Sequence, residues 1–176
     1  MMLRVKKIVS LLLAAAVCLV VLFSNSSCHI YKFNEAGTIP PDVKTVKLVQ
    51  FENKARYINP QLTQRLSDKL RQKIVSQTKL SPTSSDSAHW EISGYISDYT
   101  FSTSAISGQQ VANNRLTVSV HVTLNDRKYD KIKDYDVSRS FEFKGNQSFQ
   151  QAEAALGDEM IRTLSDEIFN KLFSDW

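Results

Sequence analysis

The chain has 176 residues, with 22 Lys and Arg against 18 Asp and Glu and a formal net charge of +4. Three of these cations, Arg4, Lys6 and Lys7, belong to the first seven residues, which leaves 19 against 18, or +1, for the rest. So balanced a composition gives no indication of nucleic-acid binding.

The first 27 residues have the order of a secretory signal peptide. Arg4, Lys6 and Lys7 precede an apolar stretch from Ile8 to Phe23, and the small or polar residues Ser24 to Ser27 follow it. The apolar stretch has about 16 residues, fewer than the roughly 20 that span a bilayer. We therefore expect residues 1–27 to be cleaved.

Cleavage before Cys28 would resemble bacterial lipoprotein processing, in which the cysteine is diacylated and becomes the first mature residue. Ser26 and Ser27 fit the small positions before such a cysteine, whereas Asn25 stands where an aliphatic residue is usual. The alternative is a free or disulfide-bonded thiol, but Cys18 would leave with the signal peptide and no other cysteine remains. We predict that Cys28 is lipidated.

Residues 28–42 are predicted to be a lipidated tether, because Gly37 and the pair Pro40-Pro41 interrupt them and they show no periodicity. Fully extended, residues 29–42 reach about 45 Å. The rest, residues 43–176, suits one domain.

The domain begins with a predicted strand over residues 43–51, whose apolar side chains fall on both faces, as in the interior of a sheet. Asn59 and Pro60 supply an N-cap and a first helical position. The helix that follows has Leu62, Leu66, Leu70 and Ile74 at every fourth position, which predicts a core-facing stripe.

Three more strands are predicted at residues 89–97, 115–124 and 137–143, of which the second alternates apolar and polar residues without a break. Between them we expect a polar loop at residues 102–114 and a charged connection at residues 126–136.

A long helix closes the chain, and Ser148 and Gln151 have the spacing of a capping box at its start. Its core stripe consists of Ala152, Leu156, Met160, Leu164, Ile168 and Leu172. Ile161, Phe169, Phe173 and Trp176 lie outside this stripe, where they either wrap around the core or form a partner surface.

These elements predict a single α+β domain with a four-stranded mixed sheet in β-α-β-β-β-α order and two helices packed on one face. The first strand, first helix and second strand form a right-handed parallel crossover. The helix-free face would carry Ser93, Thr117, Ser119, His121, Thr123, Ser138 and Ser140, with Glu91, Arg115, Arg139 and Glu142 as its charges. Such a face is either solvated or docked against a polar partner.

Catalytic motifs are absent from the sequence. His29, His89 and His121 lack Cys, Asp or Glu at metal-ligand spacing, and no phosphate loop or nucleophile elbow occurs. We expect no enzyme activity, no metal and no cofactor.

Several segments in order resemble a known family. They are "CHIYKF", "GTIPPDVKTVKLVQFENKA", the helix at Pro60, the strand from Leu116 to Leu124 and the ending "EIFNKLFSDW". Together they are similar to the lipopolysaccharide-assembly lipoprotein LptE, in its Bacteroidetes-like form. Asn25 is the main departure from the pattern.

This resemblance implies an outer-membrane lipoprotein that plugs the LptD β-barrel, helps it assemble and assists the insertion of lipopolysaccharide into the outer leaflet. No acidic cluster follows Cys28, so we expect the periplasmic side of the outer membrane. Two alternatives stay open: a lipoprotein activator of a periplasmic cell-wall enzyme, and a periplasmic lipid carrier with a pocket between helices and sheet.

Two surfaces follow as candidate sites. The Ser/Thr-rich face, represented by Ser119, His121 and Thr123, would meet the barrel partner, whose lumen is polar. Lipopolysaccharide presents phosphates beside acyl chains, so the second candidate is the group of cations interleaved with aromatic residues: Arg127, Lys128, Lys131 and Lys133. Neighbouring aspartates cancel this charge, and a merely soluble loop is the other interpretation.

Overall fold

The computed structural model describes residues 39–107 and 110–173, which belong to one compact unit. Its elements are β1 (Thr45–Leu48), β2 (Glu52–Asn53), α2 (Leu62–Gln77), β3 (Ser81–Pro82), β4 (Trp90–Ser107), β5 (Gln110–Asp126), β6 (Lys131–Lys144) and α3 (Phe149–Phe173). The predicted α+β class is confirmed. The signal peptide, Cys28, His29, most of the tether and Trp176 lie outside the described residues.

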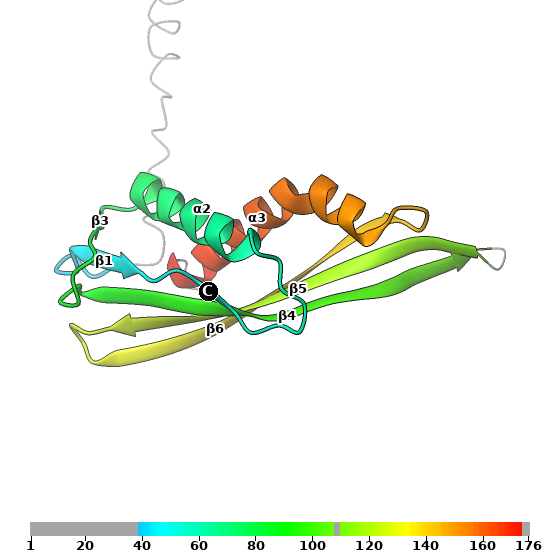
Figure 1. The fold of residues 1–176 in the computed structure, drawn as a ribbon. Coiled ribbons are helices and arrows are strands. Elements are labelled where there is room, and N and C mark those ends of the chain that lie inside the picture. The colour runs from blue at the N-terminus through cyan, green and yellow to red at the C-terminus, as the bar shows by residue number, and fades with distance from the viewer. Residues whose placement is uncertain (1–38, 108–109, 174–176) are drawn as a thin grey trace, which may run out of the picture. The chain divides into compact units, whose positions relative to one another are not determined.

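The sheet is mixed, in the order β3-β1-β4-β5-β6, and β2 also pairs with β4. β1 runs parallel to β4, as the predicted crossover requires, and β4, β5 and β6 form an antiparallel meander. The sheet has six strands instead of four, because β2 and β3 contribute two residues each. Strands this short show no alternation in a sequence. Both helices lie on the same face of the sheet (Figure 1).

The strands β4 and β5 are longer than predicted. Residues 102–107 and 110–114, expected in a loop, continue the hairpin as far as the pair Ser107 and Gln110. A β-bulge between Ile96 and Asp98 shifts the alternation by one residue, so that Ile96 and Tyr99 are both buried. Because the bulge adds one residue, the alternation of apolar and polar residues is interrupted, and the sequence pattern does not reveal the second half of β4.

The strand β6 is also longer than predicted, since residues 131–136 of the expected charged connection pair with β5. Only residues 127–130 form the turn. β6 is an edge strand, and edge strands commonly carry charges that prevent unwanted pairing. The charged residues at 131–136, which predicted a loop, therefore protect the edge strand β6 from pairing with another chain.

The core lies between the sheet and the two helices, and within the described residues neither helix has the length and hydropathy of a membrane span. The predicted stripe of α2 is buried at all four positions. The helix begins at Leu62 with Gln61 as its N-cap, so the predicted N-cap at Asn59 and first helical position at Pro60 are wrong by two residues. Asn59 Oδ1 still accepts the backbone N–H groups of Gln61 and Leu62, at 3.0 and 3.1 Å. On α3, Ile161, Phe169 and Phe173 are buried. They therefore wrap around the core.

The capping box of α3 is also confirmed. Ser148 donates its backbone N–H to Gln151 Oε1 at 3.0 Å, and Ser148 Oγ accepts the backbone N–H of Gln151 at 3.3 Å. These two bonds fix the start of the helix.

The predicted first strand is interrupted after β1, at residues 49–51, before β2 begins. In this interruption a residue of α2, instead of a neighbouring strand, accepts a backbone N–H group. Ser67 Oγ, on α2, accepts the backbone N–H of Phe51 at 2.9 Å and donates to the Thr63 carbonyl at 2.7 Å. Ser67 and Phe51 are both buried. This serine thus satisfies a buried donor that the sheet leaves unpaired.

Replacing Ser67 by alanine should lower the free energy of unfolding by about 1–3 kcal/mol, because the Phe51 N–H is then buried without an acceptor. Urea denaturation of the purified protein measures this change. Ser76 is the matched control, since it lies exposed on the same helix and Ser76→Ala should be neutral or slightly stabilising. Equal effects of the two substitutions would contradict the assigned role of Ser67.

Candidate partner-binding surface

The helix-free side of the sheet is built by every second residue of β5. Leu116, Val118, Val120, Val122 and Leu124 are buried against the helices. The residues between them point to the opposite side, which we call the outer face: Arg115, Thr117, Ser119, His121 and Thr123, with their β6 partners Glu142, Ser140, Ser138, Asp136 and Asp134. Because α2 and α3 both cover the other face (Figure 1), neither described helix covers the outer face.

The outer face is held together by a ladder of side-chain bonds between directly opposed residues of β5 and β6. Hydrogen bonds join Thr117 to Ser140 at 2.9 Å and Ser119 to Ser138 at 2.9 Å. Thr123 Oγ1 donates to Asp134 Oδ1 at 2.7 Å, and Arg115 Nη2 donates to Glu142 Oε1 at 2.9 Å. Cross-strand pairs of this kind stabilise a sheet by about 0.2–1 kcal/mol each.

His121 lies at the middle of this ladder. Its Nδ1 is 2.8 Å from Asp136 Oδ1, and its Nε2 is 3.4 Å from Asp134 Oδ1. The ring packs against Tyr95 of β4 with 5.0 Å between the ring centroids. The three predicted residues Ser119, His121 and Thr123 therefore lie on one surface, which has a regular hydrogen-bonded arrangement.

Two predictions about this face need correction. Arg139 stands opposite Val118 in the register and therefore points to the helix side, where it forms an ion pair with Glu167 of α3. Asp134 and Asp136, which the sequence predicts in a charged connection, belong to the face. The outer face is thus more acidic than the sequence suggested.

The four cations of the second candidate site do not form one cluster. Lys128 Nζ lies 3.0 Å from Asp42 Oδ2. The hydrogen bonds that Asp42 accepts from Lys128 and from the Tyr129 hydroxyl lower the pKa of Asp42. Lys131 and Lys133 are exposed on the first residues of β6. They stand opposite Asp126 and Leu124, away from the outer face.

Arg127, the fourth cation, reaches the start of β4. Its Nη2 lies 2.8 Å from Glu91 Oε2, and Lys47 Nζ lies 3.3 Å from the same oxygen and 2.6 Å from Asp86 Oδ1. Hydrogen bonding to Asp86 and Glu91 raises the pKa of Lys47. Arg127 thus belongs to a mixed-charge group that ties β1, β4 and the β5–β6 turn together.

One polar network was not apparent in the sequence. Glu153 of α3 accepts hydrogen bonds from the Tyr99 hydroxyl at 2.6 Å, the Asn59 amide at 2.9 Å and the Tyr57 hydroxyl at 3.0 Å. Burial and the neighbouring Glu153 raise the pKa of Tyr99. These residues are separated by up to 96 positions, so no local pattern could have brought them together.

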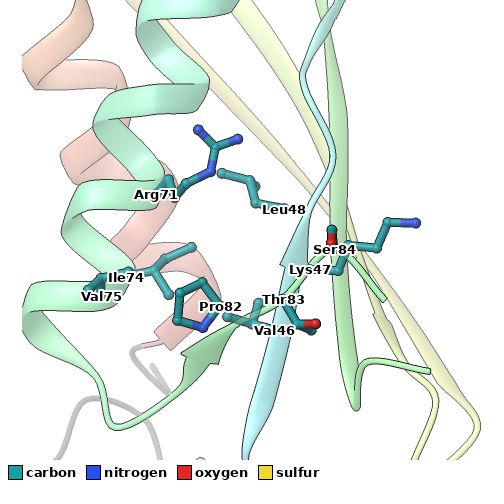
Figure 2. Close-up of a pocket in the computed structure, with 9 residues that line it drawn as sticks. All are labelled: Val46, Lys47, Leu48, Arg71, Ile74, Val75, Pro82, Thr83 and Ser84. Atoms are coloured by element: carbon teal, nitrogen blue, oxygen red, sulfur yellow. The ribbon is translucent and has the colours of Figure 1, made fainter. Parts of the chain in front are cut away.

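A groove of about 350 Å³ runs between α2 and the strands β1 and β3 (Figure 2). Its lining consists of Val46, Lys47, Leu48, Arg71, Ile74, Val75, Pro82, Thr83 and Ser84. None of these belongs to α3, and the groove lies at the edge of the sheet because β3 is its outermost strand on this side. A lipid carrier was expected to have its pocket between the sheet and both helices.

Metal ligands do not gather in the described part of the chain: no three His, Cys, Asp or Glu side chains there lie as a metal site requires. His89 instead accepts the backbone N–H of Lys44 through Nδ1 at 2.9 Å, which positions the loop before β4.

Comparisons with known proteins place this geometry in a family context. A family model described as "LptE: Lipopolysaccharide-assembly" matches residues 43–172. A search of curated proteins finds no match. Among solved structures, the chain is similar to uncharacterized lipoprotein B from Nitrosomonas europaea, with 13% identity, a TM-score of 0.51, and coverage of 77% of this chain and 89% of that chain. This likeness supports the fold.

Two further structures are similar at lower scores. The rare lipoprotein B from Shewanella oneidensis shares 15% identity, with a TM-score of 0.45 and coverage of 72% of this chain and 92% of that chain. The PelC dodecamer from Paraburkholderia phytofirmans shares 11% identity, with a TM-score of 0.49 and coverage of 80% of this chain and 95% of that chain.

Proposed function

The chain belongs to the LptE lipopolysaccharide-assembly family, and from this premise we propose that it is an outer-membrane lipoprotein that plugs an LptD-like β-barrel. In this role it helps the barrel assemble and assists lipopolysaccharide transport to the outer leaflet. The proposed work is binding, without catalysis. Lipidated Cys28 would hold the protein on the periplasmic side of the membrane.

The outer face is the observation that carries this proposal. Its hydroxyl, imidazole and carboxylate groups are hydrogen-bonded in pairs across β5 and β6, so they form a regular polar surface. The lumen of a large barrel is polar. Polar groups in such a lumen can hydrogen-bond to this surface, which would offset the cost of desolvating its hydroxyl and carboxylate groups.

Placing lysine at both Ser119 and Thr123 should weaken binding of the barrel by at least tenfold while the fold is retained. Both positions face away from the helices, so the core is undisturbed, but an interface would have to desolvate two added charges. The measurement is the amount of barrel that co-purifies with the full-length protein from solubilised outer membranes.

The matched control carries lysine at Gln72 and Ser76, two exposed positions of α2. This variant has the same added charge and should retain the barrel. Unchanged binding of the Ser119 and Thr123 variant would instead indicate a solvated face. Co-purification of the wild-type protein with a cell-wall synthase would support the activator alternative.

Direct contact with lipopolysaccharide is a separate part of the proposal and involves Arg127, Lys128, Lys131 and Lys133. Replacing all four by glutamine should reduce lipopolysaccharide capture at low salt, and the difference should fade as salt is raised, since exposed charges are screened. The barrel should still co-purify. Because Arg127 and Lys128 are engaged by Glu91 and Asp42, a variant changed only at Lys131 and Lys133 should show most of the loss. Capture that is unaffected at low salt would exclude this site.

A further inference from the structure

The hairpin of β4 and β5 extends beyond the rest of the sheet. On one side, the pairing of β6 with β5 ends at Asn113 and Lys144. On the other side, β2 pairs with β4 only at Tyr95 and Ile96. Within the described strands, the outer edge of β4 is therefore unpaired from Asp98 onward, and Figure 1 shows the hairpin continuing past both helices.

This free edge lacks the protection that the other edge of the sheet has. β6 carries Lys131, Lys133, Arg139 and Lys144 along its length. From Phe101 to Asn114 the sequence contains no Asp, Glu, Lys, Arg or Pro, although 23% of the whole chain is charged. Natural proteins block exposed edges with charges, proline or a covering segment, and a two-stranded ribbon alone is marginally stable in water. An uncharged free edge is thus suited to accept another strand.

Apolar side chains are exposed where such a strand would start. Tyr57, Ile58 and Phe101 are 38%, 63% and 44% exposed. Tyr57 stacks on Tyr99 of β4 with centroids 5.3 Å apart. It follows β2 in the chain, so it lies beside the same edge of β4 that β2 leaves free.

Contacts with α3 hold Tyr57 and Phe101 in position. Phe149 at the start of α3 makes edge-to-face contacts with Tyr57 and Phe101, at 4.8 and 5.2 Å between centroids. The Glu153 network holds the Tyr57 and Tyr99 hydroxyls. Tyr57 and Phe101 are thus preorganised, which reduces the entropy cost of binding.

We infer that the outer edge of β4, from Phe101 to Ser107, accepts an extended uncharged segment of the barrel partner as an added strand, in line with β2. This segment comes from outside the closed barrel wall, because every strand within that wall is already paired on both sides. Main-chain hydrogen bonds would supply the affinity, and the patch of Tyr57, Ile58 and Phe101 would take alternate apolar side chains. The inference rests on the proposed function for the identity of the partner and adds a second contact to the outer face.

Photo-crosslinking in cells tests this inference on the full-length, membrane-anchored protein. A photoreactive amino acid is placed at Ile58 or Thr103 beside the free edge, at Ser119 on the outer face, or at Gln72 on α2 as the control. We expect the barrel, identified by mass spectrometry, in the crosslinked products of Ile58 and Thr103 but not of Gln72.

The outcomes separate this inference from the proposed function. Crosslinks to the barrel from Ser119 alone would overturn the strand addition and leave the plug role intact. A crosslinked product that contains two copies of this chain at Ile58 and Thr103 would overturn it in favour of self-association. If the barrel neither co-purifies nor crosslinks at any position, the proposed function itself fails.

A second variant checks the contribution of the edge to binding. Lysine at both Ile58 and Thr103 should reduce the co-purified barrel at least tenfold, whereas lysine at Gln72 and Ser76 should not. Both positions are exposed, so the circular dichroism spectrum should match that of the wild-type protein. Full retention of the barrel by the Ile58 and Thr103 variant would contradict the inference.

Discussion

Replacing Gly94 by alanine should lower the free energy of unfolding by about 3 kcal/mol, the upper part of the range for overpacking. Gly94 lies in β4 opposite Val122 and faces the core. A Cβ atom at this position would lie 2.6 Å from the backbone carbonyl oxygen of His121 and 3.2 Å from two atoms of the Phe51 ring. A backbone oxygen cannot move aside without disturbing the β4–β5 pairing, so the strain has no local relief.

Gly157 on α3 provides the control for this prediction. The nearest atom to a Cβ there would be Arg65 Nη1 at 3.4 Å, the end of a flexible side chain. Gly157→Ala should therefore raise the free energy of unfolding by up to about 1 kcal/mol through helix propensity. Urea denaturation measures both variants. A Gly94→Ala protein as stable as the wild type would show that the strand approaches less closely than described.

Replacing Cys28 by alanine should remove the protein from the membrane fraction or block its processing. Two acyl chains on this cysteine would provide stable anchoring, since each buried methylene contributes about 0.8 kcal/mol and a single chain binds only marginally. Cell fractionation with immunoblotting measures the distribution, and mass spectrometry of the mature protein locates its N-terminus.

Cys18 supplies the matched control for the lipidation experiment. It belongs to the predicted signal peptide, so Cys18→Ala should leave processing and membrane binding unchanged. Persistent membrane binding by the Cys28→Ala protein, or a mature N-terminus elsewhere, would contradict the lipidation proposal.

The sequence predicted the elements that are covered on one side by the core. The alternation from Leu116 to Leu124 and the stripe from Leu62 to Ile74 repeat with the period of their own element, because each second or fourth residue meets the same core. The capping box of α3 was predictable for a related reason, since its bonds join residues three positions apart.

The sequence could not predict where β4 and β6 extend. The bulge after Ile96 breaks the alternation of β4, and the charges of β6 are those of an edge. Strand length here depends on which neighbour supplies hydrogen bonds, and that neighbour is β5 in both cases. The outer face was consequently predicted on β5 but only in part on β6.

The sequence by itself determined the α+β class, the polar character of the outer face at Ser119, His121 and Thr123, and the core stripes of both helices, because local periodicity records burial. Only the tertiary structure decided that Arg139 turns to α3, that Asp134 and Asp136 join the outer face, and that Arg127 and Lys128 separate from Lys131 and Lys133. Each of these depends on strand register, and a register is set by contacts between segments far apart in the chain. The same reason explains why Glu153 could join Tyr57, Asn59 and Tyr99 only once the chain was folded.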